Sequence, residues 1–514
     1  MSKTIIIIGA GLAGLSAALQ AAENGCNVKL VSSLSSERAQ SVMAEGGINA
    51  ALNTKDENDS PEEHFTDTIK AACGLADPNA VWGMTQAAPE LVHWLLKLGV
   101  KFNMSGYDDV DLRNFGGQKK KRTAFAQSDT GKQIMTAMID AVRRKEASGM
   151  VERFSHHSFL TLRLCSNICC GCVIRDEYSQ ETVELPGDAV IVATGGMHGL
   201  FGNTTGSLSN TGEVTAELFR LGVPLANGEM IQYHPTTVKC GGKRMLISEA
   251  ARGEGGRLFA MKDGKQWYFM EEKYPELGNL MPRDITAREI WKVSHESEVF
   301  LDMTEISEEI ISNKLSGLAD DCMTYLHKDI RKEPVSVLPG IHYFMGGILV
   351  DEQHRTPIQN LYAAGECCAQ YHGANRLGGN SLLGALYGGR VAAKSACEQA
   401  DVVDLSCATQ IDFPPASQIS EIKQLNKVMQ ETMGVVRNEN TLLNGIQTVQ
   451  ALTGNLPLLG MAVLKSALAR KESRGAHWRE DYPKSNADDY LKTTVARFDG
   501  KQIQISFVPV PERR

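Results

Sequence analysis

The chain has 514 residues, of which 42% are hydrophobic and 22% charged, which is ordinary for a soluble globular protein and long enough for roughly three or four domain-sized units. Its net charge of −8 argues against nucleic acid as the main partner, because a phosphate backbone selects basic surfaces. An anionic small-molecule substrate would therefore need local clusters of Arg and His.

The start of the chain does not resemble a targeting signal. Four isoleucines, residues 5–8, are too few for the apolar part of a signal peptide. No stretch approaches the roughly 20 apolar residues that a membrane span needs. The sequence therefore predicts a cytoplasmic protein, and a membrane-bound partner is compatible with it.

The first 31 residues predict a βαβ unit. An apolar run at residues 4–8 precedes a helix-like stretch at 12–23, and a second apolar run follows at 28–31. Three glycines with the spacing GxGxxG join the first strand to the helix: Gly9, Gly11 and Gly14. In this context they let the backbone approach a pyrophosphate at the helix N-terminus, and the alternative is a tight turn without a ligand.

Two later segments repeat the pattern of a strand followed by a turn. Residues 189–192 lead into Ala193, Thr194 and Gly195, and residues 361–364 lead into Gly365 and Glu366. A glycine-rich loop then opens a helix at about Ser381. Three such pieces with one GxGxxG indicate a single cofactor held by a discontinuous domain. FAD is favoured over NAD, because a second GxGxxG is missing and Ser32 stands where an acidic residue usually follows the second strand.

The expected fold class is α/β: a discontinuous Rossmann-like FAD-binding domain, an inserted capping domain and a C-terminal helical domain. The expected boundaries are 1–235 and 345–395 for the FAD-binding domain, 236–344 for the capping domain and 396–514 for the helical domain. An inserted domain suits a lid that closes to exclude water, so we expect the active site between the FAD-binding and capping domains.

Cysteines cluster at residues 165–172, namely Cys165, Cys169, Cys170 and Cys172. A metal site is one interpretation, but such sites usually space their cysteines across a tight turn. The run Cys169–Ile174 is more typical of a strand, and twelve cysteines in a chain of this class do not indicate a disulfide framework. We therefore predict no metal site.

Seven segments carry the most specific signal: Ala39–Asn49, Arg113–Gly117, Gln232–Thr236, Ser248–Gly256, Pro282–Asp284, His342–Gly347 and His372–Leu382. In this order they resemble the flavoprotein subunits of the fumarate reductase and succinate dehydrogenase family. A later segment, Glu472–Arg479, also resembles that family, although the tail beyond it is shorter than usual. The resemblance covers roughly residues 1–400 and implies FAD as cofactor and a dicarboxylate as substrate.

The resemblance implies which side chains bind the substrate. Arg376 and His342 would hold one carboxylate, and His234 and the hydroxyl of Ser248 would hold the other. A guanidinium fork suits a carboxylate, and most family members have Thr in place of Ser248. Phe115 would pack beside the substrate. Taken alone, either histidine is more often structural, and Phe115 would be a core residue.

The resemblance also implies a proton relay. Arg283 would deliver the proton to the substrate, supplied through Glu249 and Arg252. An arginine acid is unusual because its pKa exceeds 12, and Arg283 with Asp284 would otherwise be interpreted as a surface ion pair.

The expected cofactor contacts are mostly small residues. They are Gly9, Gly11, Gly14, Ser32, Ser41, Gly46, Gly47, Ala193, Thr194, Gly195, Glu366, Ser381 and Leu382. Many relatives attach FAD covalently through a histidine, and Gln40 occupies that position here. Glutamine cannot form the bond, so we expect non-covalent FAD.

The function implied is interconversion of fumarate and succinate by hydride transfer at flavin N5. Without the covalent bond the flavin should be the weaker oxidant, so we expect the fumarate-reducing direction, as in the electron transport of anaerobic respiration. An iron–sulfur subunit is the expected partner, and it could hold the chain at the cytoplasmic face of a membrane through an anchor subunit. The alternatives are L-aspartate oxidase acting as a single chain and a flavoprotein that only binds ligands.

Overall fold

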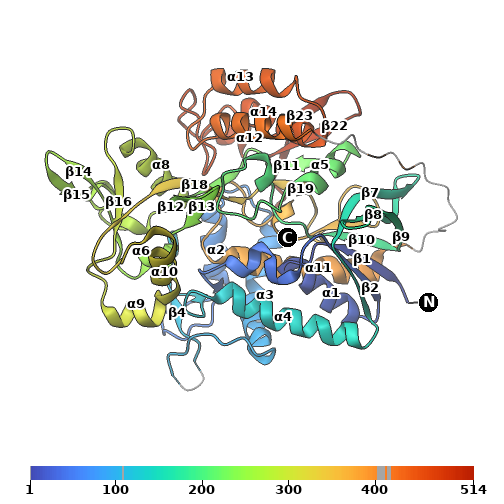
Figure 1. Ribbon diagram of the computed structural model, residues 1–514, viewed down its shortest axis with the longest axis horizontal. Coiled ribbons are helices and arrows are strands. Elements are labelled where there is room, and N and C mark those ends of the chain that lie inside the picture. Colours follow the sequence, from blue (N-terminus) through green and yellow to red (C-terminus); the bar gives the residue numbers. More distant parts are fainter. Residues whose placement is uncertain (1, 107–108, 402–410, 412, 414–417) are drawn as a thin grey trace.

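The computed structural model describes residues 2–106, 109–401, 411, 413 and 418–514 (Figure 1). At its centre is a parallel five-stranded sheet with the order β20–β10–β1–β2–β6. The strands are β1 (Thr4–Ile8), β2 (Asn27–Ser32), β6 (Val151–Ser155), β10 (Ala189–Val192) and β20 (Leu361–Ala363). Segments more than 350 residues apart therefore lie in one sheet, as a discontinuous domain requires.

Alternation along β1 explains why both faces of the sheet are covered. Ile5 and Ile7 pack against helices, whereas Ile6 and Ile8 pack against an antiparallel sheet. The helices are α1 (Leu12–Glu23), α3 (Pro78–Lys97), α4 (Thr130–Ala147) and α11 (Asn380–Gln399), and the sheet is β7 (His157–Cys165), β8 (Ile168–Asp176) and β9 (Thr182–Pro186). The strand predicted around the cysteines is β8. Its Cys169 and Cys172 are buried free thiols in the core between the central sheet and the antiparallel sheet.

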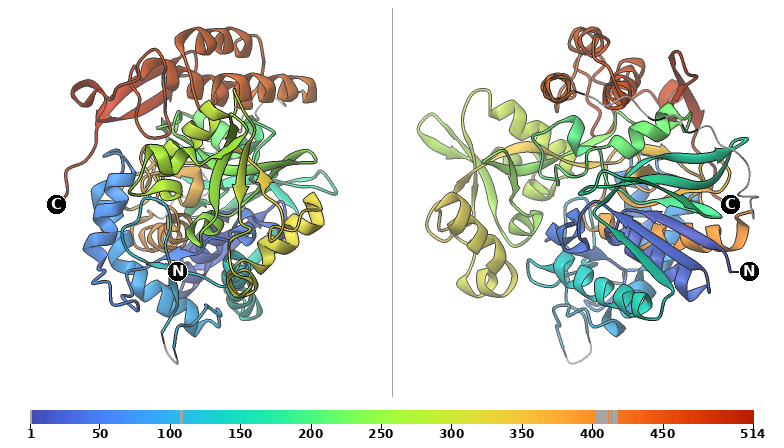
Figure 2. Two further views of the ribbon diagram at one scale, coloured as in Figure 1. Left: turned by 90° about the vertical axis from the view of Figure 1, so that its left-hand side faces the viewer. Right: turned by 45° about the vertical axis from the view of Figure 1, so that its right-hand side comes forward.

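The inserted region forms a separate lobe on the left in Figure 1, and Figure 2 shows it from the side. One sheet is β13–β12–β18, with β12 (Ile231–Cys240), β13 (Lys243–Leu246) and β18 (Leu338–Phe344). The other is β15–β14–β16–β17, with β14 (Arg257–Lys262), β15 (Lys265–Trp267), β16 (Val299–Asp302) and β17 (Val335–Ser336). Its helices are α6 (Glu249–Gly253), α7 (Phe269–Lys273), α8 (Arg283–Val293), α9 (Glu308–Lys314) and α10 (Ser316–Asp321).

The C-terminal region is helical, with α12 (Ile419–Thr432), α13 (Glu439–Val449), α14 (Asn455–Ala469) and the short α15 (Ala487–Tyr490). It also contains a hairpin that the sequence pattern did not reveal, β22 (Lys492–Phe498) and β23 (Ile503–Pro509). The hairpin extends the sheet β21–β19–β11–β22–β23 through β11 (Leu225–Ala226), β19 (Gly347–Leu349) and β21 (Cys368–Ala369). A buried ion pair also joins the C-terminal region to the segment after β11, because Nε of Arg470 and Oε1 of Glu229 lie 2.7 Å apart.

The remaining elements are short or lie at the edge. They are α2 (Pro61–Ala71), α5 (Glu213–Arg220), β3 (Ile48–Asn49), β4 (Leu112–Arg113) and β5 (Thr123–Ala124). Within the described ranges, we find no helix with the length and apolar composition of a membrane span.

Candidate active site

A cavity of about 990 Å³ is lined by both the central domain and the inserted region. We call the part around the turn after β1, Ser32 and Thr194 the cofactor end, and the part around His234, Arg283 and Arg376 the substrate end. Every predicted site residue lines this cavity except Gly14 and Arg252, which lie behind it.

The glycine turn after β1 has a backbone geometry that side chains would obstruct. Gly9 has a φ of 111°, and a Cβ there would lie 2.3 Å from the carbonyl oxygen of Ala193. A Cβ on Gly14 would lie 1.8 Å from the carbonyl oxygen of Gly9, so Gly14 lets α1 approach the strand. Gly11 differs, because a Cβ there would meet nothing closer than 3.8 Å. The first turn of α1 therefore faces the cavity without obstruction.

These features fit a dinucleotide such as FAD. A helix N-terminus with a glycine turn binds a diphosphate, and the Oγ of Ser32 is buried with no hydrogen-bond partner in the described protein. Ser41 Oγ accepts a hydrogen bond of 3.4 Å from the backbone N–H of Leu12, which ties the loop after β2 to the start of α1. Although no carboxylate follows β2 directly, Glu177 and Glu213 also line the cavity.

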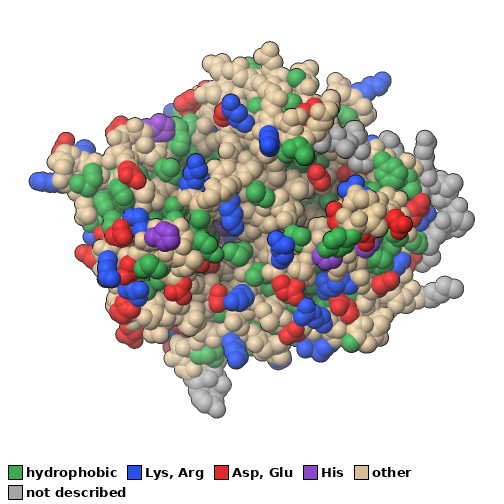
Figure 3. Space-filling view, in the orientation of Figure 1, with side chains coloured by type: hydrophobic (Ala, Val, Ile, Leu, Met, Phe, Trp, Pro, Cys, Tyr) green, Lys and Arg blue, Asp and Glu red, His purple; other side chains and the backbone are tan. Residues whose placement is uncertain are grey.

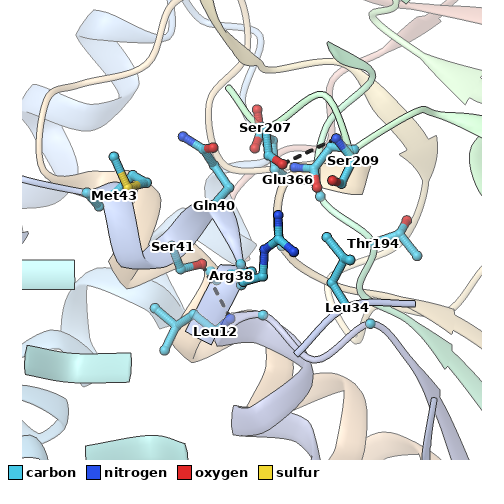
Figure 4. Close-up of a pocket in the computed structure, with 18 of the residues that line it drawn as sticks. Leu12, Leu34, Arg38, Gln40, Ser41, Met43, Thr194, Ser207, Ser209 and Glu366 are labelled. Carbon is cyan, nitrogen blue, oxygen red and sulfur yellow. Dashed lines mark hydrogen bonds between the residues drawn. The ribbon is translucent and has the colours of Figure 1, made fainter. Parts of the chain in front are cut away.

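Figure 4 shows the loop after β2, from which Arg38 and Gln40 extend into the space bordered by Thr194, Ser207 and Ser209. Gln40 thus lines the cavity with a carboxamide. Glu366 lies across this space and accepts a 3.1 Å hydrogen bond from the backbone N–H of Phe344.

At the substrate end the rings of His234 and His342 pack edge to face, with their centroids 5.1 Å apart. Thr205 Oγ1 lies 2.8 Å from Nδ1 of His342 and orients its ring, while Nδ1 of His234 lies 3.3 Å from the backbone N–H of Thr236. Burial, followed by the charge of Arg283, lowers the pKa of both histidines well below the ordinary value. Both are therefore neutral imidazoles at pH 7, suited to hydrogen bonding with a carboxylate.

Arg376 is a buried cation that could still bind an anion. Its guanidinium lies 4.4 Å from the ring centroid of Tyr343, and its Nε has no acceptor among the described residues. Burial, together with the nearby charge of Arg283, lowers the pKa of Arg376 to about 9. A dianion bound beside it would relieve this cost of burial.

Arg283 is held in place by two acceptors. Its Nε and Nη2 donate to Oε2 of Glu249 at 2.8 and 2.6 Å, and its Nη1 donates to Oε1 of Gln232 at 3.1 Å. Gln232 in turn donates to the carbonyl oxygen of Arg376 at 2.9 Å. Although burial raises it, the charges of Arg283 and Arg252 lower the pKa of Glu249 below the ordinary value, so this carboxylate is ionised.

Arg252 stands behind this pair. Its Nη2 lies 3.4 Å from Oε1 of Glu249, and its Nη1 donates to the carbonyl oxygen of Asn279 at 2.6 Å. Two guanidinium groups therefore share one carboxylate, and this buried triad has a net positive charge. The three predicted relay residues thus form a row in which Glu249 contacts Arg283 on one side and Arg252 on the other.

Ser248 and Phe115 line the same end. Ser248 is the N-cap of α6, and its Oγ accepts from the N–H of Ala250 at 3.4 Å. The ring of Phe115 packs closely against two glycines. A Cβ on Gly46 would lie 2.9 Å from this ring, and a Cβ on Gly378 would lie 3.0 Å from it. Gly46, in the loop before β3, and Gly378, in the loop before α11, thus make room for an aromatic ring.

The structure adds residues that the sequence interpretation missed. Gln232, Thr205 and Tyr343 hold the predicted arginines and histidines in position, as described above. Glu45 also lines the cavity, and its Oε2 is buried without a partner within the described part of the chain. Burial, with a contribution from Asp321, raises the pKa of Glu45 to about 8. No group of three or more metal-ligating side chains occurs among the described residues.

Comparison with known proteins identifies the family. Residues 4–382 match the FAD binding domain model, and residues 452–513 match that of the fumarate reductase flavoprotein C-terminus. The chain is 37% identical to the succinate dehydrogenase flavoprotein subunit of Bacillus subtilis, covering 100% of this chain and 98% of that protein. It is 32% identical to the 8-methylmenaquinol:fumarate reductase flavoprotein subunit of Wolinella succinogenes, covering 97% of this chain and 89% of that one.

A solved structure agrees. The quinol fumarate reductase FrdA of E. coli superimposes with a TM-score of 0.90 at 27% identity, covering 99% of this chain and 97% of that one. The FAD-binding architecture expected from the sequence is therefore confirmed. The chain belongs to the family of flavoprotein oxidoreductases that comprises the flavoprotein subunits of succinate dehydrogenases and fumarate reductases.

Proposed function

We propose that the chain reduces fumarate to succinate with non-covalently bound FAD, as the flavoprotein of a complex with an iron–sulfur subunit. The observation that supports this reaction most directly is the group of buried cationic and hydrogen-bonding side chains at the substrate end. Arg376, Arg283 and two neutral histidines surround one cavity, and they suit a small dicarboxylate dianion.

The chain's own side chains would divide the work as follows. Arg376 and His342 bind one carboxylate, and His234 and Ser248 bind the other. This holds the substrate beside Arg283, whose guanidinium is already oriented by Glu249 and Gln232. Bound FAD, once reduced through the iron–sulfur partner, would supply the hydride. Arg283 would give a proton to the neighbouring carbon. Arg252 would pass a proton to the ionised Glu249, which returns it to Arg283, and a proton from solvent would restore Arg252.

The cofactor end supports non-covalent attachment. The 8α carbon of a flavin is bonded by histidine in many relatives, and Gln40, which lines the cavity, cannot form that bond. A non-covalent flavin generally has the lower potential, which favours electron donation to fumarate over electron removal from succinate. The chain matches relatives named as succinate dehydrogenase subunits and relatives named as fumarate reductase subunits. The proposed direction of the reaction therefore depends on Gln40.

Two measurements on the purified holoprotein test this proposal. Acid precipitation should release all the yellow colour into the supernatant, and flavin that stays with the pellet would refute non-covalent binding. Fumarate reduction with a low-potential donor should be much faster than succinate oxidation with an artificial acceptor. Comparable rates in both directions would remove the directional claim and leave the chemistry intact.

The partner is tested separately. Several relatives are named as subunits, which supports an assembly for this chain as well. Purification of the tagged chain from its native cells should bring down a protein with iron–sulfur absorption. A chain that purifies alone and fully active with its physiological donor would contradict the expectation of an iron–sulfur partner.

A further inference from the structure

The hairpin formed by β12 and β13 carries three cations around its tip. Lys239 stands directly opposite Arg244, and Cys240 opposite Lys243, across the turn Gly241–Gly242. None of the described carboxylates forms an ion pair with any of these three side chains. Like charges directly opposite each other destabilise a hairpin, so hairpin stability alone does not explain this arrangement.

Arg244 is held in place by neutral groups only. Its Nη2 donates to the carbonyl oxygens of Thr237 and Leu338 at 3.2 and 3.3 Å, and its Nε donates to Oγ1 of Thr237. Gly340 makes room for it, because a Cβ there would lie 2.7 Å from Cδ of Arg244. The guanidinium is therefore oriented by the protein while its charge remains unpaired.

The hairpin borders the cavity that contains the substrate end. Lys243 and Arg244 line the same cavity as the substrate end, and Lys239, which does not line it, lies opposite Arg244 in the hairpin. Its two strands lead directly to that end, since β12 contains His234 and the residue Ser248 follows β13. Figure 3 shows Lys and Arg side chains around a hollow near the middle of this face, beside the position of β12 and β13 in Figure 1.

A second hairpin in the same lobe provides the contrast. The strands β14 and β15 place Lys262 opposite Lys265 across a two-residue turn. There, however, the turn contains Asp263, and the Lys262 ammonium lies 4.7 Å from the ring centroid of Trp267. Neither lysine lines the cavity. This hairpin thus has a carboxylate in its turn and an aromatic ring beside one of its lysines, whereas the turn of the first hairpin consists of two glycines.

We propose that Lys239, Lys243 and Arg244 form an outer anion station that attracts the dicarboxylate and passes it inward to Arg376 and the two histidines. The inference rests on the proposed function, because it assigns these residues a role in capturing the same substrate. The chain as a whole carries a net charge of −8 and repels a dianion, so a local positive field at the entrance matters for its capture. Such steering accelerates association by about 10–10³-fold and is screened by salt.

The test is a stopped-flow measurement on the holoprotein with its flavin reduced. The second-order rate constant for reoxidation by fumarate is measured for the wild type and for K239Q/K243Q, from low to high ionic strength. We expect the variant to be slower by several-fold up to about tenfold at low salt. The difference should shrink towards zero at high salt, and the limiting rate at saturating fumarate should stay within about twofold of wild type, since no reacting group has changed.

The variant K262Q/K265Q is the matched control, because it removes the same charge from a hairpin that does not line the cavity. It should retain the wild-type rate and salt dependence. Adding R244Q to K239Q/K243Q should slow capture further. If both double variants show the wild-type salt dependence, or if both lose it equally, the anion station is refuted while fumarate reduction stands. If the wild-type flavin is not reoxidised by fumarate at all, the proposed function itself falls.

Discussion

The cofactor end and the substrate end of the cavity are formed by different kinds of chemical groups. The cofactor end is made of backbone and small residues, with glycines at positions where a Cβ would come within 1.8 to 2.3 Å of a carbonyl oxygen. The substrate end is made of buried charges and neutral imidazoles that hold one another in place. The cofactor end is therefore sensitive to atoms that are added, and the substrate end is sensitive to charges that are removed.

The largest effect should come from Arg283→Ala. We expect kcat to fall by about 10²–10⁴, as for a lost general acid, while flavin content stays at the wild-type level. Steady-state kinetics together with the flavin-to-protein ratio check this. Survival of kcat to within a factor of a few would show that another group supplies the proton.

Arg376→Ala should weaken both affinity and rate, because this guanidinium contacts the substrate in the ground and transition states alike. Loss of a buried charge partner costs about 2–5 kcal/mol in kcat/KM. Tyr343→Phe is the matched control, since it keeps the ring beneath the guanidinium. A near-normal KM for fumarate in Arg376→Ala would contradict the role of this residue as the carboxylate clamp.

Glycine substitutions sharpen the contrast at the cofactor end. Gly14→Ala places a methyl group against the carbonyl oxygen of Gly9 and should lower both the stability, by about 1–3 kcal/mol, and the affinity for FAD. Gly11→Ala has room for its methyl group and should lower FAD affinity alone. Thermal unfolding and FAD titration of the two apoproteins separate these effects. Equal stability losses in both variants would contradict the packing role of Gly14.

The last prediction concerns the pH dependence of stability. The pKa of Glu45 is raised from 4.5 to about 8, so the folded chain keeps a proton that the unfolded chain releases between these values. The free energy of unfolding therefore falls as pH rises across this window, by about 1.4 kcal/mol for each pH unit. Glu45→Gln should flatten the profile and raise the melting temperature most at pH 8. Parallel profiles for the two proteins would show that Glu45 ionises normally.

The sequence predicted the central domain well because its signals are local. A strand, a glycine turn and a helix lie within the first 23 residues, and they appear as β1 and α1 with the expected bounds. The hairpin β22–β23 was missed although Asp499–Gly500, between its two seven-residue strands, is a local turn signal. Its place beside β11 could not be predicted, because β11 has two residues that pair with β22 across some 270 positions. Such a short strand has no periodicity to detect.

The substrate end could be predicted only through the family resemblance, since its side chains come from distant segments. Gln232 was nevertheless within reach of local reasoning. It lies two residues before His234 on β12, and alternate residues of a strand share a face. Glu45 carried a weaker signal, as a charged residue beside two glycines in a loop. Its raised pKa reflects its burial and the charges of residues far along the chain, such as Asp321.

The most direct test of the central claim is the reaction of the reduced flavin with substrate. The purified holoprotein is reduced anaerobically and mixed with fumarate in a stopped-flow instrument, with succinate measured at the end. The account predicts rapid return of the oxidised flavin spectrum with one succinate formed per flavin. A flavin that fumarate leaves reduced, in a protein that produces hydrogen peroxide rapidly with L-aspartate, would contradict it.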